Sequence, residues 1–214
     1  MTRLRTLSDL QDALDADHAW RVKELVNLRL AIRSDSSIGR PTLVRAGVPL
    51  LYAHWEGFIK CASMLYLEFV GSQKLKYEEL SDCFIVFGAK RHLSGLVGSK
   101  KSEINIAAVG FFLTSLGERA NLSLASAVNT ESNLNSAVFE NIAISLGVDT
   151  APYQSRFNLI DESLLKRRNN IAHGEYLDLG AEDFLTLADD VTMLMRSYKN
   201  DVSNAASTRS YRRQ

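Results

Sequence analysis

The sequence predicts an all-α protein. Only three prolines, Pro41, Pro49 and Pro152, occur in 214 residues. Long segments place apolar side chains three and four residues apart, the spacing that lines one face of a helix. Hydrophobic residues make up 46% of the chain and charged residues 23%, a composition typical of globular proteins with a buried core. We therefore expect a single helical domain over residues 1–205 and a basic, disordered tail over 206–214.

Two long helices are expected in the N-terminal part. The first covers residues 8–33, with Ser8 as its N-cap and acidic residues in its first turn, and ends near residues 34–39. The second runs from Pro41 to about Val70 and is apolar on most faces, which predicts the central helix of a bundle. Pro49 should kink or break this helix and Gly71 should end it.

The remaining helices are shorter, except for the last. Two or three are expected over residues 77–120, separated at 95–101. The polar stretch 121–136 predicts a loop or short-strand insertion. A capped helix follows over 136–149, another over 157–173 ending at Gly174, and a long final helix over 180–206.

Charge and hydropathy exclude several classes of protein. The formal net charge is zero, so an anion site must be local. No signal peptide is expected, and the richest apolar stretch is interrupted by His54, Glu56 and Lys60, which argues against a membrane span. We expect a cytoplasmic protein in which Cys61 and Cys83 are reduced, with no metal and no cofactor.

The segment "RRNNIAHGEY", residues 167–176, combines groups that suit chemistry on phosphate. Arg168 and His173 lie about 140° apart on an ideal helix, whereas Asn169 and His173 share a face. Gly174 fits the left-handed position that closes a helix. His173 would then lie at the last helical position, where its ring can turn toward Arg168.

RNA cleavage without metal needs these groups. A base takes the 2′-hydroxyl proton, an acid protonates the leaving 5′-oxygen, and positive charge stabilises the phosphorane. Histidine serves as acid or base near neutral pH, and arginine grips phosphate. One motif supplies one imidazole, so a two-fold dimer would supply the second. On local evidence alone, an ordinary helix end with basic residues at its negative dipole is the favoured explanation of the motif, and only the family resemblance reverses that order.

Two segments resemble a known family. "RNNIAHG" resembles the R-x4-6-H motif of the HEPN superfamily, and "LLYAHWEGFIKCASMLYLEFV" is similar to the central helix of the MAE-type HEPN-like nucleases. The resemblance implies a HEPN-like helical bundle with a polar insertion that dimerises with its motifs facing each other. It implies a metal-independent endoribonuclease whose catalytic residues are Arg168 and His173, together with Asn169, the polar residue that typically follows the arginine. Tyr176 lies one position beyond the tyrosine that follows the histidine in some HEPN toxins.

The same resemblance implies biological partners. Many HEPN domains act in toxin–antitoxin, restriction and abortive-infection systems, so RNA, a second copy of the chain and an antitoxin or defence-system partner are expected. The alternative is a non-catalytic RNA- or protein-binding module, in which the motif only contacts phosphate. A purely structural helical dimer is a further alternative.

Other residues have two interpretations each. Glu56 lies in an apolar helix, where it either orients Arg168 or His173 or forms a structural ion pair. Arg167 and Lys166 either contact flanking RNA phosphates or form the solvated face of their helix. Four aromatic side chains at helical spacing are expected in the core rather than on a base-stacking platform: Tyr52, Trp55, Phe58 and Tyr66.

Overall fold

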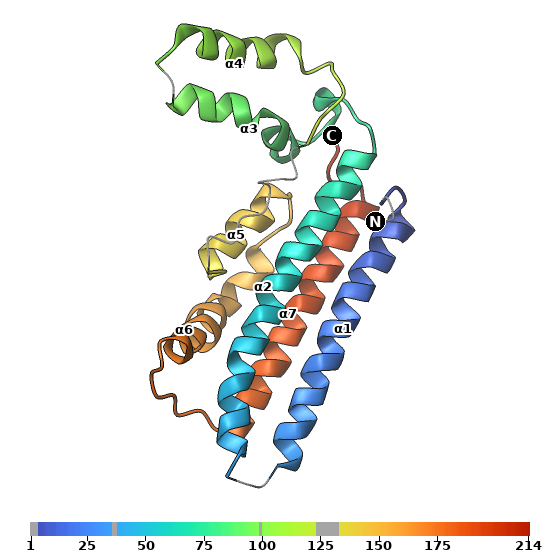
Figure 1. Cartoon of the computed structure of the whole chain (residues 1–214). Coiled ribbons are helices and arrows are strands. Elements are labelled where there is room, and N and C mark those ends of the chain that lie inside the picture. The colour runs from blue at the N-terminus through green and yellow to red at the C-terminus, as the bar shows by residue number, and fades with distance from the viewer. Residues whose placement is uncertain (1–3, 36–37, 99, 123–132) are drawn as a thin grey trace.

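Three long helices form the body of the molecule (Figure 1). The computed structural model describes residues 4–35, 38–98, 100–122 and 133–214. These residues contain no strand and the structure is 77% helical, which confirms the all-α prediction. The long helices lie side by side and are α1 (Leu7–Ser34), α2 (Arg40–Ser72) and α7 (Ala181–Ser207).

Helix α1 begins two residues earlier than the expected cap at Ser8 implies, because its N-cap is Thr6. The Thr6 side chain accepts a hydrogen bond from the backbone N–H of Asp9 at 3.1 Å, and the Asp9 carboxylate accepts one from the N–H of Thr6 at 2.8 Å. The expected cap at Ser8 is therefore wrong, because this reciprocal pair satisfies the free N–H groups two residues earlier. Hydrogen bonds from the backbone of Thr6 and Arg5 lower the pKa of Asp9.

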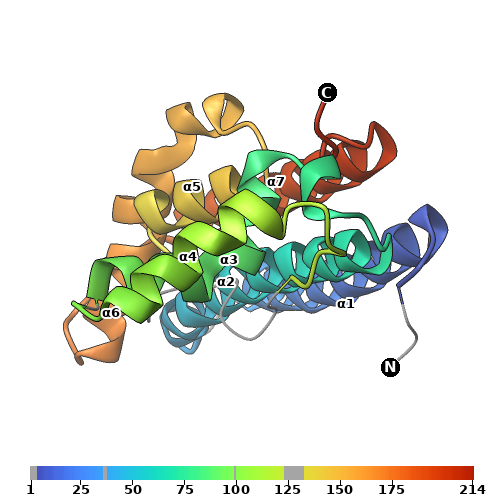
Figure 2. The ribbon, with the colours of Figure 1, turned by 90° about the horizontal axis from the view of Figure 1, so that it is seen from above.

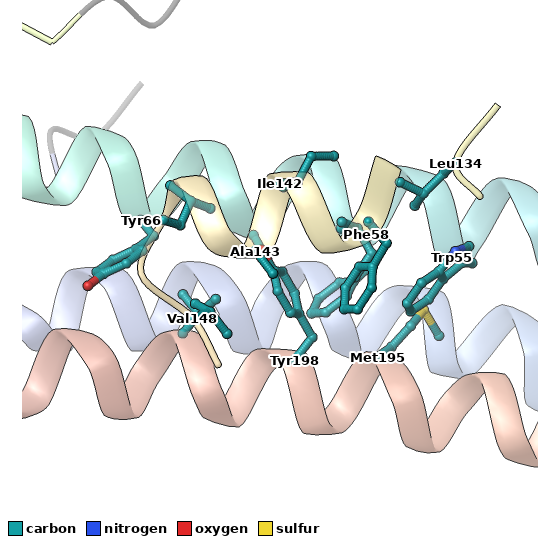
Figure 3. Packing of buried hydrophobic residues seen from close by; sticks show 14 of the residues in the cluster. Trp55, Phe58, Tyr66, Leu134, Ile142, Ala143, Val148, Met195 and Tyr198 are labelled. Atoms are coloured by element: carbon teal, nitrogen blue, oxygen red, sulfur yellow. The ribbon is translucent and has the colours of Figure 1, made fainter. Parts of the chain in front are cut away.

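Helix α2 is the central helix, as its composition predicted. Its buried residues run from Val44 to Val70. Pro49 lies inside it without ending it, and Gly71 does not stop it, since the helix continues to Ser72. Figure 3 shows side chains of α2 packing against α5 and α7. The core aromatics that were expected on α2 are buried: Tyr52, Trp55, Phe58 and Tyr66.

Shorter elements surround one side and one end of the three long helices. Two of them, α3 (Asp82–Gly98) and α4 (Ser102–Thr114), form an apolar helical hairpin that projects beyond the C-terminal end of α2 (Figures 1 and 2). The elements in chain order are η1 (Tyr77–Glu79), α3 (Asp82–Gly98), α4 (Ser102–Thr114), α5 (Ser136–Ser145), η2 (Ala151–Arg156), η3 (Leu159–Lys166) and α6 (Arg167–Ala172). The expected polar insertion over 121–136 falls largely outside the described residues, at 123–132.

The segment before the motif is not the regular α-helix that was expected over 157–173. Residues Leu159–Lys166 form a π-helix, and only Arg167–Ala172 return to α-helical geometry. Ile160, Leu164 and Leu165 on η3 are buried. A π-helix widens the turn and changes which side chains face the core, and such segments are frequent at functional sites.

The C-terminal tail is ordered, contrary to the expectation of disorder. Tyr211 is 3% exposed and its ring lies 5.9 Å from that of Phe69. The carbonyl of Tyr211 accepts a hydrogen bond from the N–H of Ser81 at 2.9 Å, and the N–H of Arg213 donates to the carbonyl of Glu79 at 3.0 Å. Burial of one aromatic ring and backbone pairing hold this basic segment in place, which its polar composition did not indicate.

Candidate active site

Arg168 lies at the centre of a group of contacts between α6 and α2. Its Nη1 donates to the side-chain oxygen of Asn169 at 2.7 Å and to that of Asn133 at 3.0 Å. Its guanidinium carbon lies 4.4 Å from the centre of the Tyr52 ring, a cation–π contact. The guanidinium is half-buried. These contacts fix its direction and leave it without a carboxylate partner at hydrogen-bond distance among the described residues.

Tyr52 supports this arginine from α2. Its hydroxyl accepts a hydrogen bond from the backbone N–H of Leu134 at 2.6 Å. That bond ties α2 to the residue after Asn133, and so positions the Asn133 side chain toward Arg168. Burial, opposed by the bond from Leu134, raises the pKa of Tyr52 to about 12, with a further increase from Glu56. The hydroxyl is therefore protonated at neutral pH.

Glu56 is adjacent to this group through Tyr52. It lies one helical turn beyond Tyr52, is half-buried, and interacts with the Tyr52 hydroxyl by charge and hydrogen bonding. Among the described residues, no ion pair joins Glu56 to Arg168 or His173. Its placement thus favours neither of the two expected roles outright, and associates the carboxylate with Tyr52 instead.

His173 lies at the end of α6, as the sequence predicted. Its backbone N–H donates to the carbonyl of Asn169 at 2.9 Å, and Gly174 has φ +79°. Gly174 N–H bonds to the carbonyl of Ile171 at 3.1 Å and Glu175 N–H to that of Asn170 at 2.8 Å, which closes the helix. The His173 side chain is exposed. No hydrogen bond joins it to Arg168 in the described part of the chain.

The two predicted phosphate contacts differ in their surroundings. Lys166 lies 2.6 Å from Glu162, one turn earlier, and both side chains are more than half exposed. Such a surface pair is worth little and does not hold the lysine away from a ligand. Arg167 is half-buried beside Arg168. Both residues lie on the same short segment as Arg168.

A separate contact positions this segment. Asp161, on η3, accepts hydrogen bonds from the backbone N–H of Ser136 at 2.7 Å and from its hydroxyl at 2.5 Å. The start of α5, with Asn133 and Leu134 before it, is thereby tied to η3. The same residues that hold Arg168 are held in turn by η3.

Sequence patterns did not identify Asn133 or Tyr52 as site residues. Asn133 contacts Arg168 across 35 positions of chain, and no periodicity reports such a contact. Tyr52 was assigned to the core, where its ring does lie. The one signal available was the four-residue spacing of Tyr52 and Glu56, which places a hydroxyl and a carboxylate on the same face of α2.

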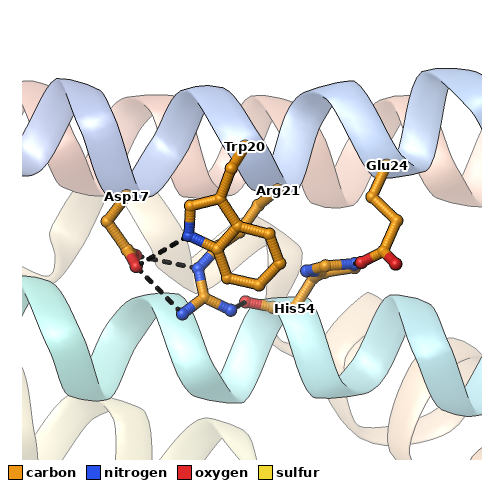
Figure 4. Close-up of polar contacts among 5 residues, drawn as sticks. All are labelled: Asp17, Trp20, Arg21, Glu24 and His54. Atoms are coloured by element: carbon orange, nitrogen blue, oxygen red, sulfur yellow. Dashed lines mark hydrogen bonds and ion pairs between the residues drawn. The ribbon is translucent and has the colours of Figure 1, made fainter.

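His54 belongs to a different polar cluster, between α1 and α2 (Figure 4). Its Nε2 lies 2.8 Å from the Glu24 carboxylate, and its ring contacts that of Trp20. Burial lowers the pKa of His54, and the half-exposed Glu24 offsets this only in part. In the same cluster, Arg21 is 8% exposed and pairs with Asp17 at 2.8 Å.

The features described above define an all-α protein with an arginine fixed on the flank of its central helix and a histidine exposed at a helix end. The sequence profile of the RiboL-PSP-HEPN family matches residues 16–204, and the chain belongs to this family. The match confirms the HEPN superfamily; the resemblance to the MAE-type branch stays an expectation. A search of curated proteins and a search of solved structures give no match. The family is associated with RNA and with nucleases.

The described residues contain neither a membrane-spanning helix nor a cluster of metal ligands. None of their helices combines the length and the hydropathy that crossing a membrane requires. No group of three or more histidine, cysteine, aspartate or glutamate side chains among them is arranged to hold a metal ion.

Proposed function

We propose that this protein is an endoribonuclease that cleaves RNA without a metal ion, with Arg168 and His173 as its catalytic residues and Asn169 as the residue that orients Arg168. One observation carries the proposal. In a chain of the HEPN family, Arg168 is held by Asn133, Asn169 and Tyr52, and no carboxylate of the described residues neutralises it. It lies five positions before His173, which the end of the helix presents to solvent. An arginine that is already fixed in this way loses little conformational entropy when it binds phosphate.

The proposed reaction divides its tasks between the two residue types. A neutral imidazole removes the proton from the 2′-hydroxyl, whose oxygen then attacks the phosphorus. Arg168 stabilises the charge on the phosphorane oxygens. A protonated imidazole gives its proton to the departing 5′-oxygen. The products are a 2′,3′-cyclic phosphate and a 5′-hydroxyl end, and a 3′-hydroxyl end would contradict this mechanism.

The reaction needs an acid and a base, and each chain has one His173. We therefore place the reaction in a homodimer in which the two motifs meet in one cleft. The exposure of His173 supports this placement, because a ring that the described residues leave exposed is available to a second protomer and to RNA. The resemblance to MAE-type nucleases extends the proposal to a toxin or defence nuclease with an antitoxin or other partner protein.

The test is RNA cleavage in excess EDTA. Purified wild type, the Arg168→Ala/His173→Ala double variant and Arg119→Ala are incubated with total RNA after their melting temperatures have been compared. Arg119 is an exposed arginine beside the C-terminal end of α2, and serves as the matched control for loss of charge. We expect cleavage by wild type and Arg119→Ala, and a loss of at least about 100-fold in the double variant.

Two outcomes would contradict the proposal. If the double variant cleaves RNA as fast as wild type, Arg168 and His173 are not the catalytic residues. Absence of cleavage by wild type, together with RNA binding that depends on Arg168, would identify a non-catalytic RNA-binding module instead.

A further inference from the structure

A groove lies between the start of α2 and the segment that joins α6 to α7. It has a volume of about 490 Å³ and is lined on one side by residues 40–42, 44 and 45 of α2 and on the other by residues 176–181. Ligand pockets in proteins commonly have volumes in this range. The segment that forms its second wall begins three residues after His173, so at most about 11 Å of chain separates His173 from the groove.

Two arginines line the groove and lack strong partners. Arg45 is half-buried and has no hydrogen bond or ion pair among the described residues. Arg40 approaches Glu182 only to 3.9 Å, and that carboxylate is 87% exposed. The Nε of Arg40 is shielded from solvent and has no hydrogen-bond partner in the described part of the chain. The lining contains two arginines and one carboxylate, Asp178. Glu182 lies outside the lining and is directed into solvent, so the groove itself is positively charged.

The rest of the groove suits an aromatic ring. Tyr176 is 87% exposed, although it is a large aromatic residue. Beside it the lining is apolar and contains Pro41, Val44, Leu177 and Leu179. A positively charged groove with an exposed aromatic side chain is the arrangement that binds single-stranded nucleic acid, because phosphates meet the cations and bases stack on the ring.

The groove is in line with the candidate active site. Arg45, Tyr52 and Glu56 are seven and four residues apart, so they lie on one side of α2. Seven residues of helix correspond to about 10 Å, or about three stacked nucleotides. A strand whose phosphate is bound by Arg168, above Tyr52, would reach the groove by following α2 toward its N-terminus.

We propose that this groove binds a nucleotide of the RNA strand a few positions from the cut, with Arg40 and Arg45 on its phosphate and Tyr176 on its base. The assignment of this nucleotide to a position near the cut rests on the proposed nuclease function. Binding of the strand in the groove does not depend on cleavage.

The test measures binding of a fluorescent 12-nucleotide single-stranded RNA in EDTA, in a His173→Ala background that keeps the strand intact. Arg45→Ala is expected to weaken binding and to reduce the slope of log K against log salt by about 0.7. Tyr176→Ala is expected to weaken binding at least about fivefold, and Tyr176→Phe to retain it. Because Tyr176 is exposed, its replacement should leave the melting temperature unchanged. Arg119→Ala is the control and should bind like the background protein.

Unchanged affinity in both Arg45→Ala and Tyr176→Ala would overturn the inference, as would an absence of RNA binding by the background protein. A groove that binds free AMP as tightly as the strand would overturn its assignment to RNA. Cleavage by wild type is measured separately. If wild type does not cut RNA but the groove variants lose binding, the nuclease proposal is wrong and RNA binding in the groove is supported. If wild type cuts RNA but the groove variants bind it unchanged, the nuclease proposal is supported and the groove proposal is wrong.

Discussion

At the scale of single residues, the site depends on how Arg168 is oriented. The sequence allowed Arg168 and Asn169 to be named, because both lie in one short motif, and their side chains bond at 2.7 Å. It did not allow Asn133 to be named, because that contact depends on the tertiary fold. Tyr52 was correctly expected in the core, yet its ring also faces the guanidinium. A buried residue that touches a functional one has no separate signature in the sequence.

Tyr52 offers a way to separate support from chemistry. Tyr52→Phe keeps the ring below Arg168 but leaves the N–H of Leu134 without its acceptor. We expect the free energy of unfolding to fall by about 1–3 kcal/mol, as measured by urea denaturation, while RNA cleavage below the melting transition stays within a few-fold of wild type. Tyr52→Leu, which also removes the cation–π contact, should reduce cleavage further. A Phe variant as inactive as Arg168→Ala would instead show that the hydroxyl takes part in the reaction.

At the scale of elements, periodicity predicted most helices and missed the geometry of one. The helices over 8–33, 41–70 and 180–206 appear close to their expected positions because their apolar residues repeat regularly. The π-helix Leu159–Lys166 was not expected, since buried residues 160, 164 and 165 also fit an α-helix. Gly57 on α2 leaves room for the Arg21 side chain of α1: a Cβ there would lie 2.6 Å from the Arg21 guanidinium.

The contact between α1 and α2 predicts a pH dependence of stability. Burial lowers the pKa of both His54 and His18 in the folded protein. Above about pH 6.5 both are neutral in the folded and unfolded chains. Below it the unfolded chain takes up protons first, so the free energy of unfolding falls as pH falls, by at most about 1.4 kcal/mol per pH unit for each histidine.

The measurement is urea denaturation from pH 7.5 to 5.5 for wild type and His54→Gln. The variant should lose part of the slope over this window. Identical slopes in the two proteins would mean that His54 titrates alike in the folded and unfolded chains, contrary to its burial.

At the scale of the whole molecule, the bundle and the family were predictable from the sequence, whereas the order of the tail was not. The motif and the apolar central helix carried the resemblance, and the match over residues 16–204 agrees with it. The basic composition of residues 206–214 gave no sign that the Tyr211 ring packs against Phe69 or that its carbonyl accepts a hydrogen bond from the N–H of Ser81. Because the formal net charge is zero, RNA binding must come from local groups such as Arg168 and the groove arginines rather than from a global field.

In the proposed dimer, two motifs from two protomers form one metal-independent cleft. The decisive experiment mixes wild type with His173→Ala, exchanges protomers by co-refolding, and measures RNA cleavage in EDTA at constant total protein. If both imidazoles are required, activity follows the square of the wild-type fraction and falls to about one quarter at equal mixing. Activity that falls in proportion, to about one half, would mean that each chain acts alone. Absence of cleavage by unmixed wild type would mean that the protein is not a nuclease of this kind.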